Sequence, residues 1–258
     1  MIDLQASFDS RNVPLERVGV KDLRYPIKVL QPNGKLQDTI AKININIDLH
    51  PEYRGAHMSR FIEIVETISG QELTVSTIPE ILEVTKIKLN SKTAEIDIHF
   101  PYFIPKSAPV SHAIGMVDYQ CNIYGRLKDD IDFRYGVTVP VTSLCPCSKE
   151  ISNYGAHNQR CLVSLDIRTE QKEIIWFEEL IQLIESSASA PIYSILKRED
   201  EKFVTEQAYN NPVFVEDIVR DLSLKIERDN RIIWFKLEAI SEESIHNHNA
   251  FAATERTK

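Results

Sequence analysis

The stretch Ile40-Ala-Lys-Ile-Asn-Ile-Asn-Ile-Asp-Leu49 is the clearest sign of the fold class. Ile43, Ile45 and Ile47 alternate here with asparagine and aspartate side chains. An apolar residue at every second position is the period of a β-strand that buries one face and leaves the other polar. We therefore predict a strand at residues 40–49, in a sheet that is covered on one side.

Two helices and two further strands are predicted downstream of this strand. Apolar residues recur at helical spacing over residues 58–68. A second helix is predicted to begin at Thr77, where a threonine, a proline and a glutamate resemble a capping box. Alternating apolar residues then predict strands at 94–100 and 113–124. The first half of the chain thus reads strand, helix, helix, strand, strand.

The second half of the chain repeats this order. Strands are predicted at 135–141, 161–167 and 232–240, and a helix is predicted at 176–187. Asn211 is predicted to cap a further helix, with Pro212 at its first position. Strands that follow one another, with helices grouped between them, favour an α+β fold with antiparallel sheets. We place a boundary near residues 128–132, which gives domains at 1–130 and 131–258.

The composition excludes several classes of protein. Hydrophobic residues make up 43% of the 258 residues, yet no apolar run approaches the ~18 residues that a membrane-spanning helix needs. The net charge of −8 disfavours a broad surface for nucleic acid or anionic membranes. Residues 1–11 carry Asp3 and Asp9 and lack the cationic start of a secretory signal, so we expect a cytoplasmic protein.

Glycine and cysteine narrow the kinds of site that the chain can hold. The 8 glycines are too widely spaced to form a G-x-G fingerprint or a P-loop, so a nucleotide must be bound in another way. The 4 cysteines are too few for a disulfide scaffold in a chain of this length. Reduced thiols or metal ligands are therefore expected.

The segment 142–160 has the features of a loop that carries a functional site. Cys145 and Cys147 flank Pro146, and His157 follows ten residues after the second thiol. Thiolate and neutral imidazole are ligands that zinc prefers, which makes zinc the first expectation. The C-x-C spacing differs from the C-x-x-C of structural zinc sites, so a redox pair or two buried thiols are the alternatives.

Two further groups of residues are candidates for chemistry. Glu243, His246 and His248 lie close together in the tail, and an H-x-H pair places both imidazoles on one face of an extended segment. Such histidines exchange protons at neutral pH or bind metal; the alternative is a solvated tail. Glu216 lies beside the apolar stripe of the last predicted helix and either faces a ligand or is a surface carboxylate.

Several motifs together resemble the prokaryotic type IB form of GTP cyclohydrolase I. They are Thr142-Ser-Leu-Cys-Pro-Cys-Ser-Lys-Glu-Ile-Ser152, Gly155-Ala-His-Asn-Gln-Arg160, Arg54-Gly-Ala-His-Met-Ser-Arg-Phe61, Lys106-Ser-Ala-Pro-Val-Ser111, Leu196-Lys-Arg198, Val204-Thr-Glu206 and Val215-Glu-Asp217. They agree with that family in order and separation over about residues 10–255. The resemblance implies two tandem tunnelling-fold (T-fold) modules, each an antiparallel sheet with two helices on one face. It also implies conversion of GTP and water to 7,8-dihydroneopterin triphosphate and formate, in folate and pterin biosynthesis.

The resemblance also implies a divalent metal, either zinc or manganese. Cys147 and His157 match metal ligands of the family, and Glu201 matches an oxygen ligand. Cys145 is an alternative to Cys147 as the thiolate, and Glu199 or Glu206 is an alternative to Glu201. Cys147 is also expected to take part in catalysis.

The remaining roles implied by the resemblance concern the substrate and the assembly. Glu216 matches the carboxylate that accepts hydrogen bonds from the guanine edge. His246 and His248 match proton carriers, with Glu243 orienting them or reaching the metal. Lys149, Arg160, Lys197 and Arg198 are nearby cations for the triphosphate, and Lys149 and Arg160 are the two assigned to it. A homotetramer with active sites between subunits is expected.

Two rival functions follow from the same residues. One is a different purine or pterin enzyme that keeps the Glu216 anchor and performs other chemistry. The other is a non-catalytic zinc-binding or thiol-switch module that uses Cys145 and Cys147. Release of formate from GTP distinguishes the cyclohydrolase from the first rival. Replacement of His246 distinguishes it from the second, because a non-catalytic site would be unaffected by that change.

Overall fold

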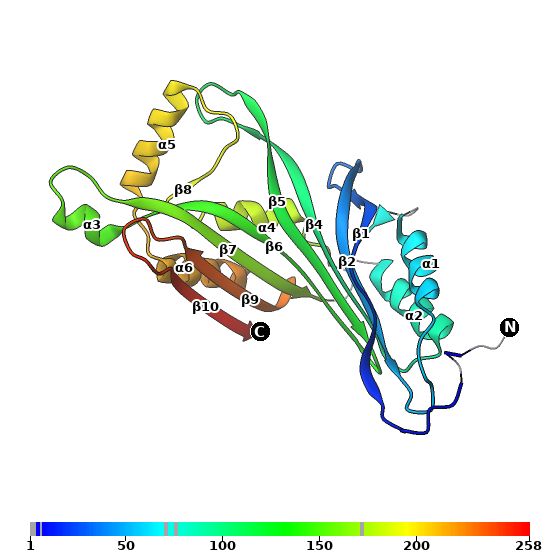
Figure 1. Cartoon of the computed structure of the whole chain (residues 1–258). Coiled ribbons are helices and arrows are strands. Elements are labelled where there is room, and N and C mark those ends of the chain that lie inside the picture. Colours follow the sequence, from blue (N-terminus) through cyan, green and yellow to red (C-terminus); the bar gives the residue numbers. More distant parts are fainter. Residues whose placement is uncertain (1–3, 6, 70–71, 75–76, 171–172) are drawn as a thin grey trace. The chain divides into compact units, whose positions relative to one another are not determined.

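The computed structural model describes residues 4–5, 7–69, 72–74, 77–170 and 173–258 (Figure 1). The helices are α1 (Met58–Ser69), α2 (Thr77–Leu89), α3 (Pro146–Ile151), α4 (Phe177–Glu185), α5 (Arg198–Asn210) and α6 (Val215–Arg228). The strands are β1 (Leu15–Leu30), β2 (Leu36–Leu49), β3 (Glu72–Leu73), β4 (Ala94–Ser107), β5 (Ile114–Leu127), β6 (Ile131–Leu144), β7 (Asn158–Thr169), β8 (Ala190–Pro191), β9 (Ile232–Ser241) and β10 (Ala250–Thr257).

The ten strands form a single sheet. Its order is β10-β9-β7-β6-β5-β4-β2-β1-β3, with β8 paired to β6. The prediction of two tandem T-fold modules, each with its own sheet, is therefore wrong. The reason lies in strand length: β4, β5 and β6 each have 14 residues, and the hydrogen-bonded order continues through them without a break. The sequence pattern had indicated shorter strands there.

The chain divides into two compact units that are not consecutive halves. The first contains residues 1–101 and 122–135, and the second contains residues 102–121 and 136–258. Segments from the middle strands contribute to both units, so the units do not follow the order of the sequence. The prediction instead divided the chain at a single point, into residues 1–130 and 131–258.

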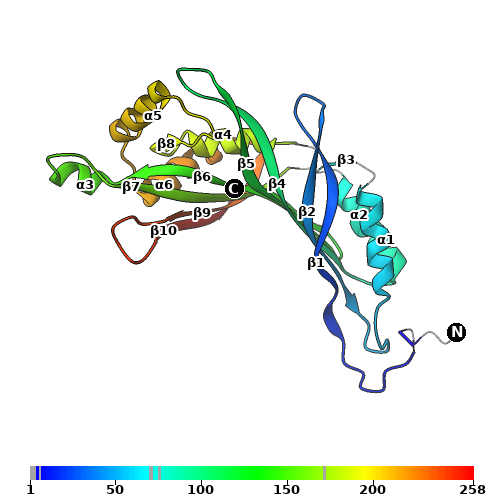
Figure 2. The same cartoon turned by 45° about the horizontal axis from the view of Figure 1, so that its top comes forward.

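The first unit packs α1 and α2 on one side of β1 and β2 (Figures 1 and 2). The isoleucines of β2 that opened the sequence pattern, Ile43, Ile45 and Ile47, are all buried, as predicted. Gly125 of β5 lets α2 approach closely, because a Cβ atom there would lie 2.6 Å from a methyl carbon of Ile78. The predicted strand and both predicted helices are confirmed here.

The second unit buries one face of α4 and of α6, and it carries all the residues nominated for chemistry. In α6 the apolar stripe Val215, Ile218, Val219, Leu222 and Ile226 is buried, as the spacing predicted. The predicted cap is wrong, because Asn211 ends α5 and its backbone N–H donates to the carbonyls of Gln207 and Ala208. The helix α6 begins at Val215, with Phe214 as its N-cap.

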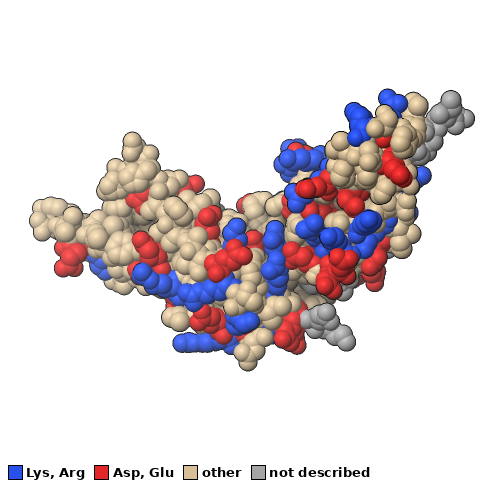
Figure 3. Space-filling model, turned by 90° about the horizontal axis from the view of Figure 1, so that it is seen from below, with Lys and Arg blue, Asp and Glu red and all other residues tan. Residues whose placement is uncertain are grey.

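Charges of both signs alternate on the strands of the second unit. The register places Asp166 of β7 and Glu255 of β10 on either side of Lys236 of β9, and opposite charges on neighbouring strands stabilise a sheet. Basic and acidic side chains are likewise intermixed on the face of the molecule seen in Figure 3. In the parts of the chain that the structure describes, the helices are too short or too polar to cross a bilayer.

Candidate functional site

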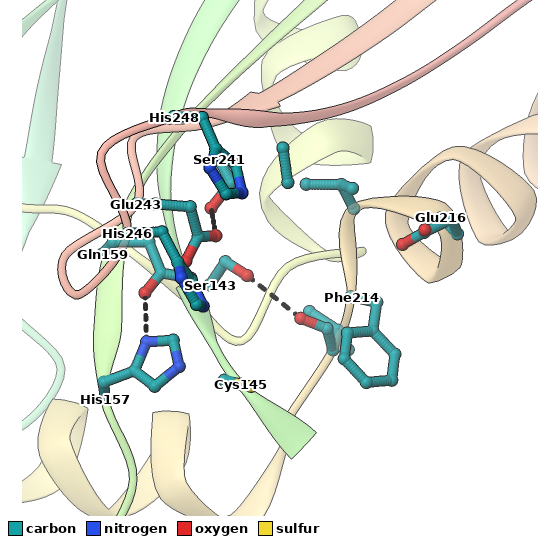
Figure 4. Close-up of a pocket in the computed structure, with 13 residues that line it drawn as sticks. Ser143, Cys145, His157, Gln159, Phe214, Glu216, Ser241, Glu243, His246 and His248 are labelled. Atoms are coloured by element: carbon teal, nitrogen blue, oxygen red, sulfur yellow. Dashed lines mark hydrogen bonds between the residues drawn. The ribbon is translucent and has the colours of Figure 1, made fainter. Parts of the chain in front are cut away.

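A pocket of about 240 Å³ in the second unit gathers most of the nominated side chains. Figure 4 shows Cys145, His157, Glu243 and His246 on one side of this pocket and Glu216 across from them. His248 also lines it, as do Ser143, Gln159, Phe214 and Ser241. One thiol, three imidazoles and two carboxylates therefore converge from four separate segments of the chain.

The end of β6 and the start of β7 place Cys145 beside His157. The backbone N–H of Cys145 donates to the carbonyl oxygen of His157 at 3.1 Å. Pro146 occupies the first turn of α3, which makes Cys145 the N-cap of that helix, and its Sγ atom accepts from the Ser148 N–H at 3.4 Å. The thiol is half-buried, and the chain on both sides of it is held by hydrogen bonds.

Gln159 fixes the ring of His157. The two side chains lie on the same face of the extended chain, two residues apart, and His157 Nδ1 lies 2.9 Å from Gln159 Oε1. An amide oxygen only accepts hydrogen bonds, so this contact places the ring proton on Nδ1. Metal-bound histidines commonly donate their other ring N–H in this way, and the lone pair of Nε2 is then left to bind a metal.

The pairing of β7 with β9 brings the tail to the same place. Cys161 lies opposite Ser241 in the register, and the Glu242 N–H donates to the Arg160 carbonyl at 2.8 Å. Glu243 follows, half-buried, with its Oε1 accepting from Ser241 Oγ at 3.0 Å. The tail carboxylate is therefore held over the start of β7.

His246 and His248 lie in the connection between β9 and β10, which is not a strand. Their rings nevertheless stack, with centroids 5.2 Å apart and an interplanar angle of 20°. Both side chains are exposed and both line the pocket. They are thus open to solvent and able to exchange protons with it.

Glu216 reaches the pocket from the first turn of α6. The segment before this helix is tied to the end of β6, because Ser143 Oγ donates to the Val213 carbonyl at 3.0 Å and the Val213 N–H donates to the Leu144 carbonyl at 3.2 Å. Val215 and Ile218 are buried, whereas Glu216 is exposed toward the pocket. The carboxylate is therefore presented from a packed helix.

Four nominated residues lie outside the pocket lining. Cys147 and Lys149 are on α3; Cys147 is exposed, and the Lys149 ammonium donates to the Tyr209 carbonyl and lies 4.4 Å from that ring. Arg160 is exposed on β7, and Glu201 is exposed in the first turn of α5. The alternatives Glu199 and Glu206 are also exposed on α5. The structure therefore brings Cys145, and not Cys147, next to His157.

The chemistry of the lining fits a divalent metal. Thiolate, imidazole and carboxylate are the ligands of zinc, and carboxylate also suits manganese. Cys145, His157 and Glu243 supply one of each, and the bond that His157 Nδ1 donates to Gln159 leaves Nε2 available. Within the described residues, however, no three His, Cys, Asp or Glu side chains are grouped closely enough to form a complete metal site.

The pocket lining is acidic. Glu216 and Glu243 belong to it, and none of the described residues that line it is a lysine or an arginine. Acceptors that face the pocket suit the N–H donors of a purine edge, while a phosphate chain must be held by cations outside this lining.

Burial separates the four thiols into two classes. Desolvation, with a smaller contribution from Glu242, raises the pKa of Cys161 to about 12, and desolvation beside Glu178 raises the pKa of Cys121 well above its usual value. Because the thiolate is the reactive form, iodoacetamide at neutral pH is expected to modify Cys145 and Cys147 and to spare the buried pair. Mass spectrometry of the digested protein measures this; equal labelling of all four would contradict it.

Sequence reasoning missed the role of Gln159. The signal was present, because Gln159 lies two residues after His157, just before the strand predicted at 161–167, and alternate residues of an extended chain share a face. Phe214 was missed as well: it is 39% exposed and offers a flat apolar surface to the pocket. Phe214 is not part of the apolar stripe of α6, so the spacing of apolar residues did not single it out.

The fold of the chain is similar to that of uricases. The uricase from Arthrobacter globiformis matches with a TM-score of 0.59 and 8% identity, covering 94% of this chain and 93% of that one. A uricase from Bacillus fastidious matches with a TM-score of 0.58, 7% identity and the same coverage. At this identity the likeness concerns the fold alone.

The sequence comparisons identify the family. The family model described as type I GTP cyclohydrolase FolE2 matches residues 1–252. The GTP cyclohydrolase FolE2 of Geobacter sulfurreducens is 49% identical over 258 residues, covering 100% of this chain and 99% of the relative. That of Syntrophobacter fumaroxidans is 46% identical over 260 residues, covering both chains completely. The expected relationship to type I GTP cyclohydrolases is thus confirmed, and the chain belongs to the type I GTP cyclohydrolase FolE2 family.

Proposed function

We propose that the protein converts GTP and water to 7,8-dihydroneopterin triphosphate and formate, in folate and pterin biosynthesis. The observation that carries this proposal is the pocket in which Cys145, His157 and Glu243 face Glu216. It combines donors suited to a metal with a carboxylate suited to a guanine edge. A purine held by Glu216 would turn its imidazole ring toward the thiol and the histidines.

The reaction demands a strong nucleophile at neutral pH. Carbon 8 of guanine has to accept hydroxide, the adjacent nitrogen has to be protonated, and the ring then opens before the formyl group is hydrolysed. A divalent metal held by side chains of this pocket would supply hydroxide without a strong base, since such ions lower the pKa of bound water toward ~7. The proton transfers fall to side chains of this chain.

Cys145, His157 and an acidic side chain are proposed to hold the metal. Cys145 lining the pocket beside His157 supports it as the thiolate, in preference to the exposed Cys147. Glu243 in the lining and Glu201 on α5 are the proposed oxygen ligands. The mixture of sulfur, nitrogen and oxygen donors suits zinc, with manganese as the alternative.

His246 and His248 are proposed to carry protons to and from the substrate. Both are exposed and both face the pocket, so each can exchange its proton with solvent between steps. Glu243 lies two residues beyond Ser241, which donates to it, and can orient an imidazolium nearby.

Replacing Glu216 by glutamine tests the proposed recognition of guanine. The carboxylate only accepts hydrogen bonds, whereas the amide offers one acceptor and one donor to the guanine N–H groups. Loss of a hydrogen bond to a charged acceptor is expected to raise the KM for GTP roughly tenfold to a hundredfold. Steady-state kinetics measure this, with Glu83→Gln, an exposed glutamate on α2 in the first unit, as the control. An unchanged KM would remove Glu216 from this role.

Lys149 and Arg160 are the proposed contacts of the triphosphate, since the described residues that line the pocket include no lysine or arginine. Arg160 is exposed on β7, the strand that begins directly after His157, and Lys149 is on the helix that Cys145 caps. A homotetrameric assembly and a cytoplasmic location also stay predictions.

Formate release is the experiment that tests the proposed function. Purified protein with GTP and zinc, manganese or cobalt is expected to release formate and to develop the fluorescence of an oxidised pterin. The absence of both products with all three metals would overturn the cyclohydrolase proposal. Consumption of GTP without formate would favour a different purine enzyme that keeps the Glu216 anchor.

A further inference from the structure

Asp200 is a buried carboxylate outside the pocket, and its two oxygens accept four hydrogen bonds. Its side chain lies in the first turn of α5 and is 0% exposed. Oδ1 accepts from the backbone N–H groups of Val110 and Ser111, both at 2.8 Å. Oδ2 accepts from the Ser111 hydroxyl at 2.5 Å and from the Lys197 N–H at 2.8 Å.

These bonds exceed what a helix cap requires. A capping carboxylate needs only the bond to the N-cap residue, which here is Lys197. The other three bonds come from the connection between β4 and β5, about 90 positions earlier in the sequence. A buried carboxylate is tolerated only when hydrogen-bond donors satisfy it. These three bonds therefore hold the first turn of α5 to the connection between β4 and β5.

The body of α5 packs against the segments that carry Cys145 and His157. Val204 and Ala208 of this helix lie in one apolar cluster with Leu144, which precedes Cys145, and with Ala156, which precedes His157. Residues three and seven positions apart share a face of a helix. Glu201 precedes Val204 by three and Ala208 by seven, so it lies on the face of α5 turned toward these segments.

We propose that Asp200 and Ser111 are positioning residues for the metal site, acting through Glu201. The pair fixes the start of α5 while Val204 and Ala208 fix its body. Together they determine where the adjacent Glu201 carboxylate stands relative to Cys145 and His157. This inference rests on the proposed role of Glu201 as an oxygen ligand.

Ser111→Ala is the variant that tests the positioning. It removes one donor to Asp200 and leaves the three backbone donors in place, so the chain is expected to fold. Titration of the full-length protein with Co²⁺, followed by ligand-field absorption, measures metal affinity without GTP. Affinity is expected to fall about tenfold, as for other groups that orient metal ligands, and Ser111→Thr, which keeps the hydroxyl, is expected to restore it.

The pathway through Glu201 is tested by a double-mutant cycle. If Ser111 acts through Glu201, adding Ser111→Ala to Glu201→Gln is expected to weaken Co²⁺ binding no further. The matched control is Ser194→Ala, which removes a hydroxyl contact from the segment before α5 to the Met116 carbonyl of β5. Its Co²⁺ affinity is expected to equal that of the unchanged protein.

Three outcomes would overturn the inference. They are unaltered Co²⁺ affinity in Ser111→Ala, unaltered affinity in Glu201→Gln, and additive losses in the double variant. A protein that binds Co²⁺ but releases no formate from GTP would instead overturn the proposed function, and the titration would still decide the role of Ser111 and Asp200.

Discussion

Cys145→Ser is expected to lower GTP turnover by about two orders of magnitude or more, because the proposed thiolate ligand of the metal is lost. The structure places this thiol in the pocket, hydrogen-bonded through its backbone to His157. Cys147 is exposed on α3 and outside the lining. The loss in Cys147→Ser is therefore expected to be at least about tenfold smaller than in Cys145→Ser.

Formate release measures turnover in both variants, and elemental analysis of the purified proteins measures bound metal. Cys145→Ser is expected to lose metal, whereas Cys147→Ser is expected to keep it. The reverse order would return the thiolate role to Cys147, as the family resemblance first implied. Equal and small losses would remove both thiols from the metal site and would contradict the proposed ligand set.

His246→Ala is expected to keep the fold and the bound metal and to lower kcat by about two to four orders of magnitude, the usual contribution of a positioned general acid or base. The residue is exposed in the connection between β9 and β10, so its removal leaves no cavity in the core. Its ring stacks on that of His248, which is expected to compensate only in part.

The pH profile of kcat and the circular dichroism spectrum are the measurements. His50→Ala, which removes an exposed histidine in the first unit, serves as the control and is expected to retain full turnover. A folded His246→Ala protein with unchanged kcat would exclude His246 as a proton carrier. It would also favour the rival interpretation of the cysteines as a non-catalytic site.

Local periodicity predicted individual elements well. The alternation in 40–49 and the helical spacing in 58–68 each report a single buried face, and both were confirmed. The pairing of strands into one sheet was not predicted, because hydrogen bonds between strands leave no mark on the spacing within a strand. Asn211 shows the same limit: an asparagine can cap a helix or end one, and here its neighbours in α5 decide.

The candidate site was predicted in its residue types and less well in its membership. The motifs around His157, Glu216 and His246 pointed to residues that the pocket does bring together. The spacing C-x-C could not tell which thiol faces the pocket. That choice depends on Pro146, which starts α3 directly after Cys145 and turns Cys147 onto the exposed side of the helix.

The sequence by itself determined the periodicity of the elements, the acidic balance of the chain and the set of side chains able to do the chemistry. These properties follow from residue types and their spacing, which are local. The tertiary structure decided the single sheet, the meeting of Cys145 with His157, and the attachment of α5 through Asp200 to Ser111. Each of these depends on contacts between residues far apart in the chain, and such contacts form only when the strands and helices pack together.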